Sequence, residues 1–122
     1  MEFDRWTVLF LRRREDAPPL SEAESAALQD AHLAYLARLH EDGRLVAAGP
    51  VQGVPELRLA GVCIYTTSVE DAQALAQEDP AVRAGVFRVE LWSWWVPGGA
   101  LRFDPVRFPH SMAEVGEKST PE

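Results

Sequence analysis

The chain has 122 residues, of which 47% are hydrophobic and 25% charged, so it is long enough for one domain with a modest core. Its net charge of −7 argues against broad nucleic-acid binding, which needs clustered positive charge. The single cysteine, Cys63, excludes an intrachain disulfide. No secretory signal is visible, and the apolar run from Trp6 to Leu11 is far shorter than the roughly 20 residues of a membrane helix. We expect a cytoplasmic protein that does not enter a membrane.

The first predicted element is a strand over residues 5–13, a segment rich in β-branched and aromatic residues. It is apolar on both of its alternating faces, so both faces must be covered. Helices of the same chain can cover one face. The other face needs a cover from elsewhere.

The segment from Ser21 to Gly43 predicts one long amphipathic helix. Ser21 and Glu24 have the spacing of a capping box, and Gly43 suits the left-handed position that follows a helix. The residues at helical spacing on its apolar side are Leu28, His32, Tyr35, Leu36 and Leu39. A histidine therefore occupies the middle of an otherwise apolar and aromatic stripe.

The remaining pattern predicts strands over residues 45–51, 56–66 and 86–96, a helix over 69–77 and a helical turn over 81–84. The resulting β-α-β-β-α-β order predicts an α+β, ferredoxin-like fold with both helices on one face of a four-stranded antiparallel sheet. We assign residues 1–100 to this domain. Residues 101–122 form a proline-containing C-terminal tail, expected to pack through Phe103 and Phe108 and to have a mobile end.

The last predicted strand places Trp92 and Trp94 on the face that no helix covers. Two tryptophans on an open sheet face form a patch that is unfavourable in water. We therefore expect a homodimer that forms through the open sheet faces.

The three histidines differ in their surroundings. His40, near the end of the long helix, and His110, in the tail, are expected to be solvated. For His32 two interpretations remain open: a hydrogen-bonded core residue, or an acid–base group, because imidazole titrates near neutral pH.

Asp79 also allows two interpretations. It precedes Pro80 and is suited to cap the short helical turn that follows. In a ferredoxin-like fold both helices share one sheet face, so Asp79 can also lie near the first helix. A carboxylate bonded to one imidazole nitrogen leaves the other nitrogen free to act on a substrate.

The sequence gives little support for a metal, cofactor or cysteine-nucleophile site. The histidines lack metal-ligand spacing, and no Walker motif, dinucleotide fingerprint or G-x-S-x-G sequence is present, so we expect neither a metal nor a cofactor. Cys63 lies mid-strand between Gly61 and Tyr65 and is interpreted as a buried structural thiol.

Three segments together resemble the YciI-like (YCII-related) family of dimeric α+β barrel proteins. They are WTVLFLRR, HLAYLARLHEDGRLVAAGPV and SVEDAQALAQEDPAVRAGVFRVELWSWWVP, with D-P-A-V-x-A-G within the last, and they cover about residues 5–97. The resemblance implies a ferredoxin-like protomer that dimerises through its sheets as a dimeric α/β barrel. The long tail after Gly99 departs from the shortest family members.

The resemblance also implies a site built on a histidine–aspartate pair, here His32 and Asp79. Gly49 and Pro50 match the family's glycine–proline turn, which is expected to line the same pocket. Some relatives are enzymes, one of them a dehydrochlorinase acting on a chlorinated hydroxyhydroquinone. The resulting hypothesis is an enzyme using acid–base chemistry on a small organic molecule, lyase-, dehydrochlorinase- or isomerase-like, with Tyr35 and Trp94 also expected to contact the substrate. The alternative is a dimeric binding or accessory module without catalysis.

Overall fold

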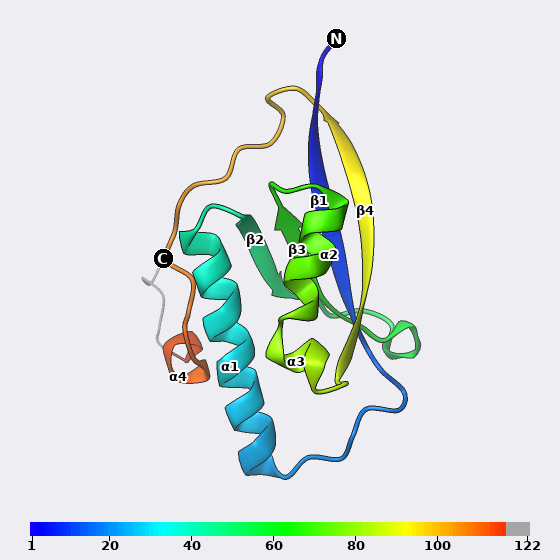
Figure 1. Cartoon of the computed structure of the whole chain (residues 1–122), viewed down its shortest axis with the longest axis vertical. Helices are drawn as coiled ribbons and strands as arrows, with labels where there is room; N and C mark the ends of the chain where they lie inside the picture. The colour runs from blue at the N-terminus through cyan, green and yellow to red at the C-terminus, as the bar shows by residue number, and fades with distance from the viewer. Residues whose placement is uncertain (117–122) are drawn as a thin grey trace.

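A computed structural model describes residues 1–116, which form one four-stranded antiparallel sheet with helices on one face (Figure 1). The elements in chain order are β1 (Phe3–Arg13), α1 (Glu22–Glu41), β2 (Leu45–Pro50), the 3-10 turn η1 (Pro55–Leu57), β3 (Leu59–Tyr65), α2 (Val69–Gln77), α3 (Pro80–Arg83), β4 (Phe87–Pro97) and α4 (Met112–Val115). The expected mobile end of the tail, residues 117–122, lies outside the described residues. Within residues 1–116 no helix combines the length and apolar character needed to cross a membrane.

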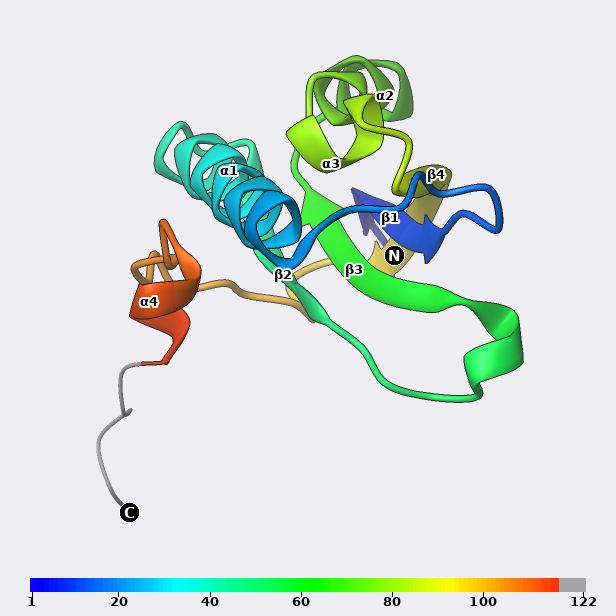
Figure 2. The same cartoon turned by 90° about the horizontal axis from the view of Figure 1, so that it is seen from below.

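The sheet has the strand order β2-β3-β1-β4, with β1 and β3 in the middle. This is the order of a ferredoxin-like fold, and the predicted fold class is confirmed. β1 pairs with β4 along its whole length, from Phe3 opposite Pro97 to Arg13 opposite Phe87. Figure 2 shows α1, α2 and α3 together on one side of the sheet. That common side brings residues of α1 close to the turn between α2 and α3.

α1 begins and ends as its sequence predicts. The Ser21 hydroxyl accepts from the Glu24 backbone N–H at 3.1 Å, and the Glu24 carboxylate accepts from the Ser21 N–H at 2.9 Å. Beyond the helix, Gly43 has a φ of +78°, a conformation that side-chain-bearing residues rarely adopt. The buried residues of α1 are His32, Tyr35, Leu36, Ala37 and Leu39. Of these, Tyr35, Leu36 and Leu39 belong to the hydrophobic core, together with Leu9, Leu11, Leu45, Cys63 and Tyr65 of the sheet.

β3 begins at Leu59, three residues later than predicted. Pro55 starts the 3-10 turn η1, and Arg58 then takes a left-handed conformation with a φ of +56°. A residue in that conformation cannot continue a strand. The alternation of apolar residues in the sequence therefore extended the predicted strand across a turn.

The face of the sheet opposite the helices carries Trp92 and Trp94, whose exposed fractions are 57% and 41%. They lie opposite Val8 and Trp6 of β1 and alternate with the inward-facing Leu91. The predicted orientation of the two tryptophans is therefore correct for the single chain.

After β4 the chain passes to the outer side of α1, where α4 lies (Figure 1). We call residues 103–116 the C-terminal arm. As the sequence predicts, its two phenylalanines pack on the domain: Phe103 lies edge-on to Trp6, and Phe108 stacks on His40 with ring centroids 3.8 Å apart.

The expectation that His40 is solvated is wrong. Its ring is half-buried, with Nδ1 2.6 Å from the Leu45 carbonyl oxygen and Nε2 2.7 Å from that of Val106. His40 thus joins α1, β2 and the C-terminal arm. Its position at the end of a helix gave no sign of the arm that covers it.

Candidate active site

His32 and Asp79 lie in direct contact inside the domain. Nδ1 of His32 is 2.8 Å from Oδ2 of Asp79 and 2.9 Å from its Oδ1. The exposed fractions of the two residues are only 6% and 3%. A buried carboxylate needs a polar partner, and this imidazole supplies it.

Asp79 is placed by the turn between α2 and α3. Its Oδ1 also accepts a hydrogen bond from the Ala81 N–H at 2.9 Å, which makes Asp79 the N-cap of α3. Pro80 occupies the first helical position, where its missing N–H costs nothing. α3 packs beside α1, as Figure 1 shows, so the capping carboxylate reaches His32. One carboxylate therefore fulfils both of the alternatives raised by the sequence.

Three other titratable side chains surround the pair. Burial raises the pKa of the Cys63 thiol to about 12, and the negative charge of Asp79 adds to this effect. Burial likewise raises the pKa values of Tyr65 and Tyr35, again with a contribution from Asp79. All three groups stay neutral at neutral pH. Among these neighbours of Asp79, His32 alone can become positively charged.

A cavity of about 350 Å³ lies against His32, between α1, the β2–β3 side of the sheet and the C-terminal arm. Its lining residues are mostly apolar: Leu11, Gln29, His32, Leu33, Leu36, Ala48, Gly49, Pro50, Ala60, Gly61, Val62, Cys63, Phe87, Phe108, Pro109, Met112 and Val115. Gly49 and Pro50 thus lie where the resemblance implies. In the part of the chain that the structure describes, no group of three or more His, Cys, Asp or Glu residues is arranged to hold a metal ion.

The second ring nitrogen of His32 is the one available to the cavity. Within residues 1–116, Nε2 has no hydrogen-bond partner, and the only fully buried polar side-chain atom without a partner is Trp6 Nε1. Nε2 is therefore open to the cavity that the ring lines. Because an ionised carboxylate can only accept, Nδ1 carries a hydrogen in the neutral ring and Nε2 carries the lone pair. This tautomer can take a proton from a molecule in the cavity.

Tyr35 and Trp94 lie outside this cavity, although the sequence predicts that both contact the substrate. The Tyr35 hydroxyl donates to the Leu75 carbonyl oxygen at 2.6 Å, so the side chain joins α1 to α2. Trp94 lies on the open face, on the other side of the sheet from His32. Neither side chain lines the cavity.

The arm residues at the cavity are ones that sequence reasoning missed. Phe108 was expected only to pack, and Met112 and Val115 were not singled out. The spacing of Met112 and Val115, three residues apart, puts both on one side of a helical turn. That short pattern was the only available signal.

Comparison with known proteins places this site in a family. The family model of the YCII-related domain matches residues 7–95, which include most of β1 and β4, all of β2 and β3, and both residues of the buried pair. The chain belongs to the YCII-related domain family. Protein YciI of Escherichia coli and Protein YciI of Shigella flexneri are each 43% identical over 68 residues, which cover 50% of this chain and 69% of the relative. The YCII-related family suggested by the sequence is thereby confirmed.

A solved structure shares the fold. It is the 5-chloro-2-hydroxyhydroquinone dehydrochlorinase TftG from Burkholderia phenoliruptrix, in complex with 2,5-dihydroxybenzoquinone. The match covers 73% of this chain and 92% of TftG, with a TM-score of 0.52 and 21% sequence identity. At this identity the likeness establishes the ferredoxin-like YCII fold, and the chemistry of this chain must be argued from its own residues.

Proposed function

We propose that this YCII-related protein is an enzyme that moves a proton to or from a small organic molecule bound beside His32. The observation that carries the proposal is the His32–Asp79 contact at 2.8 Å next to a cavity of about 350 Å³. A general base must lie within hydrogen-bonding reach of its substrate, and a ring edge open to a cavity meets that requirement. TftG, which shares the fold, is an enzyme, and this supports the same conclusion.

In the proposed reaction, Nε2 of His32 takes a proton from the substrate. The ring becomes positively charged, and Asp79, which already holds Nδ1–H, stabilises that charge without taking the proton. If a chloride leaves the substrate as the proton is removed, the overall reaction is loss of HCl. The dehydrochlorinase activity named for TftG is of this kind. A proton returned to another position of the substrate gives an isomerase instead.

The proposal is tested with 5-chloro-2-hydroxyhydroquinone, by following chloride release under anaerobic conditions. Wild-type protein is expected to release chloride catalytically, and His32→Asn to lose about 100-fold or more of the rate, the usual contribution of a general base. Asp79→Asn should also be slowed because the negative charge is lost. The matched control Asp71→Asn changes an exposed carboxylate in the first turn of α2 and should react like wild type.

Two outcomes would contradict the proposal. No chloride release by wild-type protein would rule out this substrate and the dehydrochlorination form of the reaction. A folded His32→Asn protein with wild-type turnover would remove the acid–base role itself.

A non-catalytic binding module is the second candidate. It is favoured by the capping bond from Ala81 to Asp79, which gives the carboxylate a structural reason to be present. This alternative predicts that a ligand binds in the cavity and is recovered unchanged. Mass spectrometry of the ligand after prolonged incubation distinguishes the two candidates.

We further propose that the protein is a cytoplasmic homodimer. The exposed Trp92 and Trp94 support a partner on the open sheet face, since burying them removes apolar surface from water. The cytoplasmic assignment rests on the single cysteine, which gives the domain no disulfide to form.

A further inference from the structure

The C-terminal arm forms one wall of the His32 cavity. It contributes Phe108, Pro109, Met112 and Val115, all of them apolar. Phe108 and Pro109 are half-buried, while Met112 and Val115 are 45% and 50% exposed. Phe108 therefore lies deeper in the wall, and the two residues of α4 form its rim. This wall lies beyond the matched family region, which ends at residue 95.

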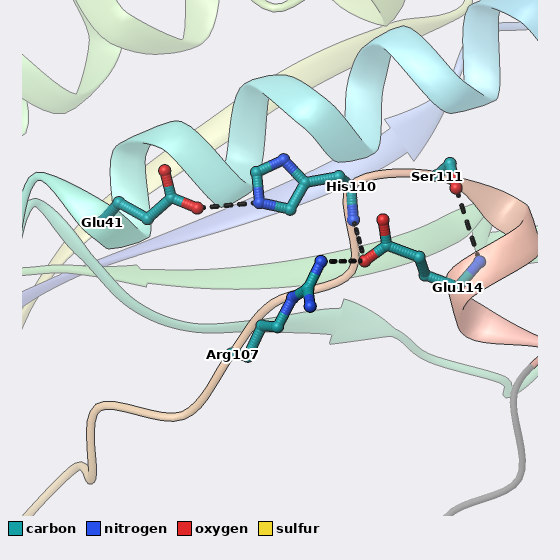
Figure 3. A network of polar contacts seen from close by, with 5 residues as sticks. All are labelled: Glu41, Arg107, His110, Ser111 and Glu114. Carbon is teal, nitrogen blue, oxygen red and sulfur yellow. Dashed lines mark hydrogen bonds and ion pairs between the residues drawn. The ribbon is translucent and has the colours of Figure 1, made fainter.

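The arm is attached to α1 at several points. The Met112 N–H donates to the Asp30 carboxylate at 2.8 Å, and the His110 ring lies 2.7 Å from the Glu41 carboxylate. Figure 3 shows the second contact, together with Glu114, which accepts from the His110 N–H at 3.2 Å. The stack of Phe108 on His40 adds a third attachment. These contacts give the apolar wall a defined position relative to His32.

The lining of the cavity indicates which ligands fit. Among residues 1–116, no residue lining the cavity is Lys, Arg, Asp or Glu, and the lining side chains with polar atoms are Gln29, His32 and the neutral thiol of Cys63. A buried ionic group without a partner is strongly disfavoured, so a carboxylate or phosphate has no suitable place here. An engineered apolar cavity of about 150 Å³ is known to hold benzene. A cavity of about 350 Å³ therefore suits one ring with substituents, or two fused rings.

We propose that the arm wall, through Phe108 and Met112, sets the width of a cavity that selects uncharged one- or two-ring aromatic alcohols. This inference rests on the proposed function in that it names the ligand class of the same site. The hydroxyl provides the removable proton for His32, and the rings occupy the apolar space between α1, the sheet and the arm.

The ligand class is tested by calorimetric titration of the full chain with three probes: phenol, 2-naphthol and 2-naphthoate. Near neutral pH the two alcohols are uncharged and the carboxylate is ionised. We expect saturable binding of both alcohols and at least about tenfold weaker binding of 2-naphthoate, because the only described lining side chain that can carry a positive charge, His32, is already paired with the Asp79 carboxylate. Equal binding of 2-naphthoate and 2-naphthol, or no saturable binding of either alcohol, would overturn the inference.

The wall is tested with a matched pair of substitutions in α4. Met112→Trp fills the rim of the cavity. It should weaken the binding of 2-naphthol by about tenfold or more and change the affinity for phenol by less than about threefold. Ala113→Trp adds the same side chain at the neighbouring position, which is exposed and outside the cavity, and should leave both affinities unchanged. Met112→Ala widens the rim and should raise the affinity for 2-naphthol relative to the affinity for phenol. The same response to Met112→Trp and Ala113→Trp would overturn the role of the wall.

Binding and turnover keep this inference separate from the proposed function. His32→Asn should slow chloride release by about 100-fold or more yet still bind 2-naphthol, since it leaves the arm wall unchanged. If wild-type protein binds the alcohols with the expected response to Met112→Trp but releases no chloride, the inference about the arm wall is supported and the dehydrochlorination proposal is refuted. If chloride is released and the two tryptophan variants bind the probes alike, only the inference about the arm wall is refuted.

Discussion

Replacing Asp79 by alanine removes two hydrogen bonds that depend on one carboxylate. Asp79 caps α3 through the Ala81 N–H and accepts from Nδ1 of His32. Loss of an N-cap costs about 1 kcal/mol of unfolding free energy. Leaving the buried Nδ1–H without an acceptor costs about 1–3 kcal/mol more. Because Asp79 is only 3% exposed, water does not replace either bond, and the expected total is about 2–4 kcal/mol.

Two further variants separate these contributions. Asp79→Ser can still cap α3 but is too short to reach His32, so it should cost about 1–3 kcal/mol. Ser68→Ala removes only the N-cap of α2, where the hydroxyl accepts from the Asp71 N–H at 3.1 Å. It should cost about 1 kcal/mol.

The free energies of unfolding are measured by urea denaturation followed through helical circular dichroism at pH 7. In thermal scans each kcal/mol should lower the melting temperature by about 4 °C for a chain of this size. Asp79→Ala should thus melt about 8–16 °C below wild type. If Asp79→Ala is no less stable than Ser68→Ala, the contact with His32 contributes nothing, and the reasoning is refuted.

Three other predictions concern the core, the thiol and the open face. Leu45→Ala should cost about 2–5 kcal/mol in urea denaturation because Leu45 is 0% exposed, whereas Leu57→Ala, 64% exposed, should stay within about 0.5 kcal/mol; equal costs would contradict the assigned core. The folded pKa of Cys63, raised from 9.0 to about 12, predicts slow reaction with a thiol reagent at pH 8 and fast reaction in urea. Because the thiol ionises at a lower pH in the unfolded chain than in the folded one, its contribution to the free energy of unfolding is full below pH 9 and is lost as the pH rises toward 12. A Cys63→Ala variant that loses the same stability at alkaline pH would contradict this. Light scattering at micromolar concentration should give a dimer for wild type and a monomer for Trp92→Glu, and a monomeric wild type would refute the proposed interface.

The buried pair could be anticipated because each member lies in a strong local pattern. His32 lies at helical spacing among the apolar residues of a helix whose start is marked by a capping box. Asp79 precedes a proline that fixes the start of α3. The ferredoxin-like order then places both segments on one sheet face. Neither pattern contains the distance between the two side chains, which depends on how closely α3 packs on α1.

Tyr35 shows where helical spacing becomes too coarse. It lies three residues after His32, about 60° away around the helix axis. That rotation directs its hydroxyl to Leu75 of α2 and away from the cavity. Leu36, four residues after His32, lies closer to the direction of the histidine and does line the cavity.

Apart from the packing of Phe103 and Phe108, the contacts of the arm could not be predicted from the sequence, because they are few and not periodic. His40 meets the backbone carbonyl oxygen of Val106, which every residue type possesses, so the partner leaves no trace in the sequence. The attachment of Met112 uses a backbone N–H for the same reason. Such contacts are visible only once the chain is folded.

The tryptophans of this protein are separated from the His32 cavity. All four tryptophans, Trp6, Trp92, Trp94 and Trp95, belong to the paired strands β1 and β4, and none lines the cavity. Trp6, Trp92 and Trp94 lie on the open face of the sheet, whereas Trp95 follows Trp94 along β4 and points to the other side. Intrinsic tryptophan fluorescence of this protein therefore reports mainly on the open face, and its emission should shift when that face is covered. A ligand beside His32 would reach these indoles only by energy transfer, so assembly and ligand binding can be followed as separate signals in one cuvette.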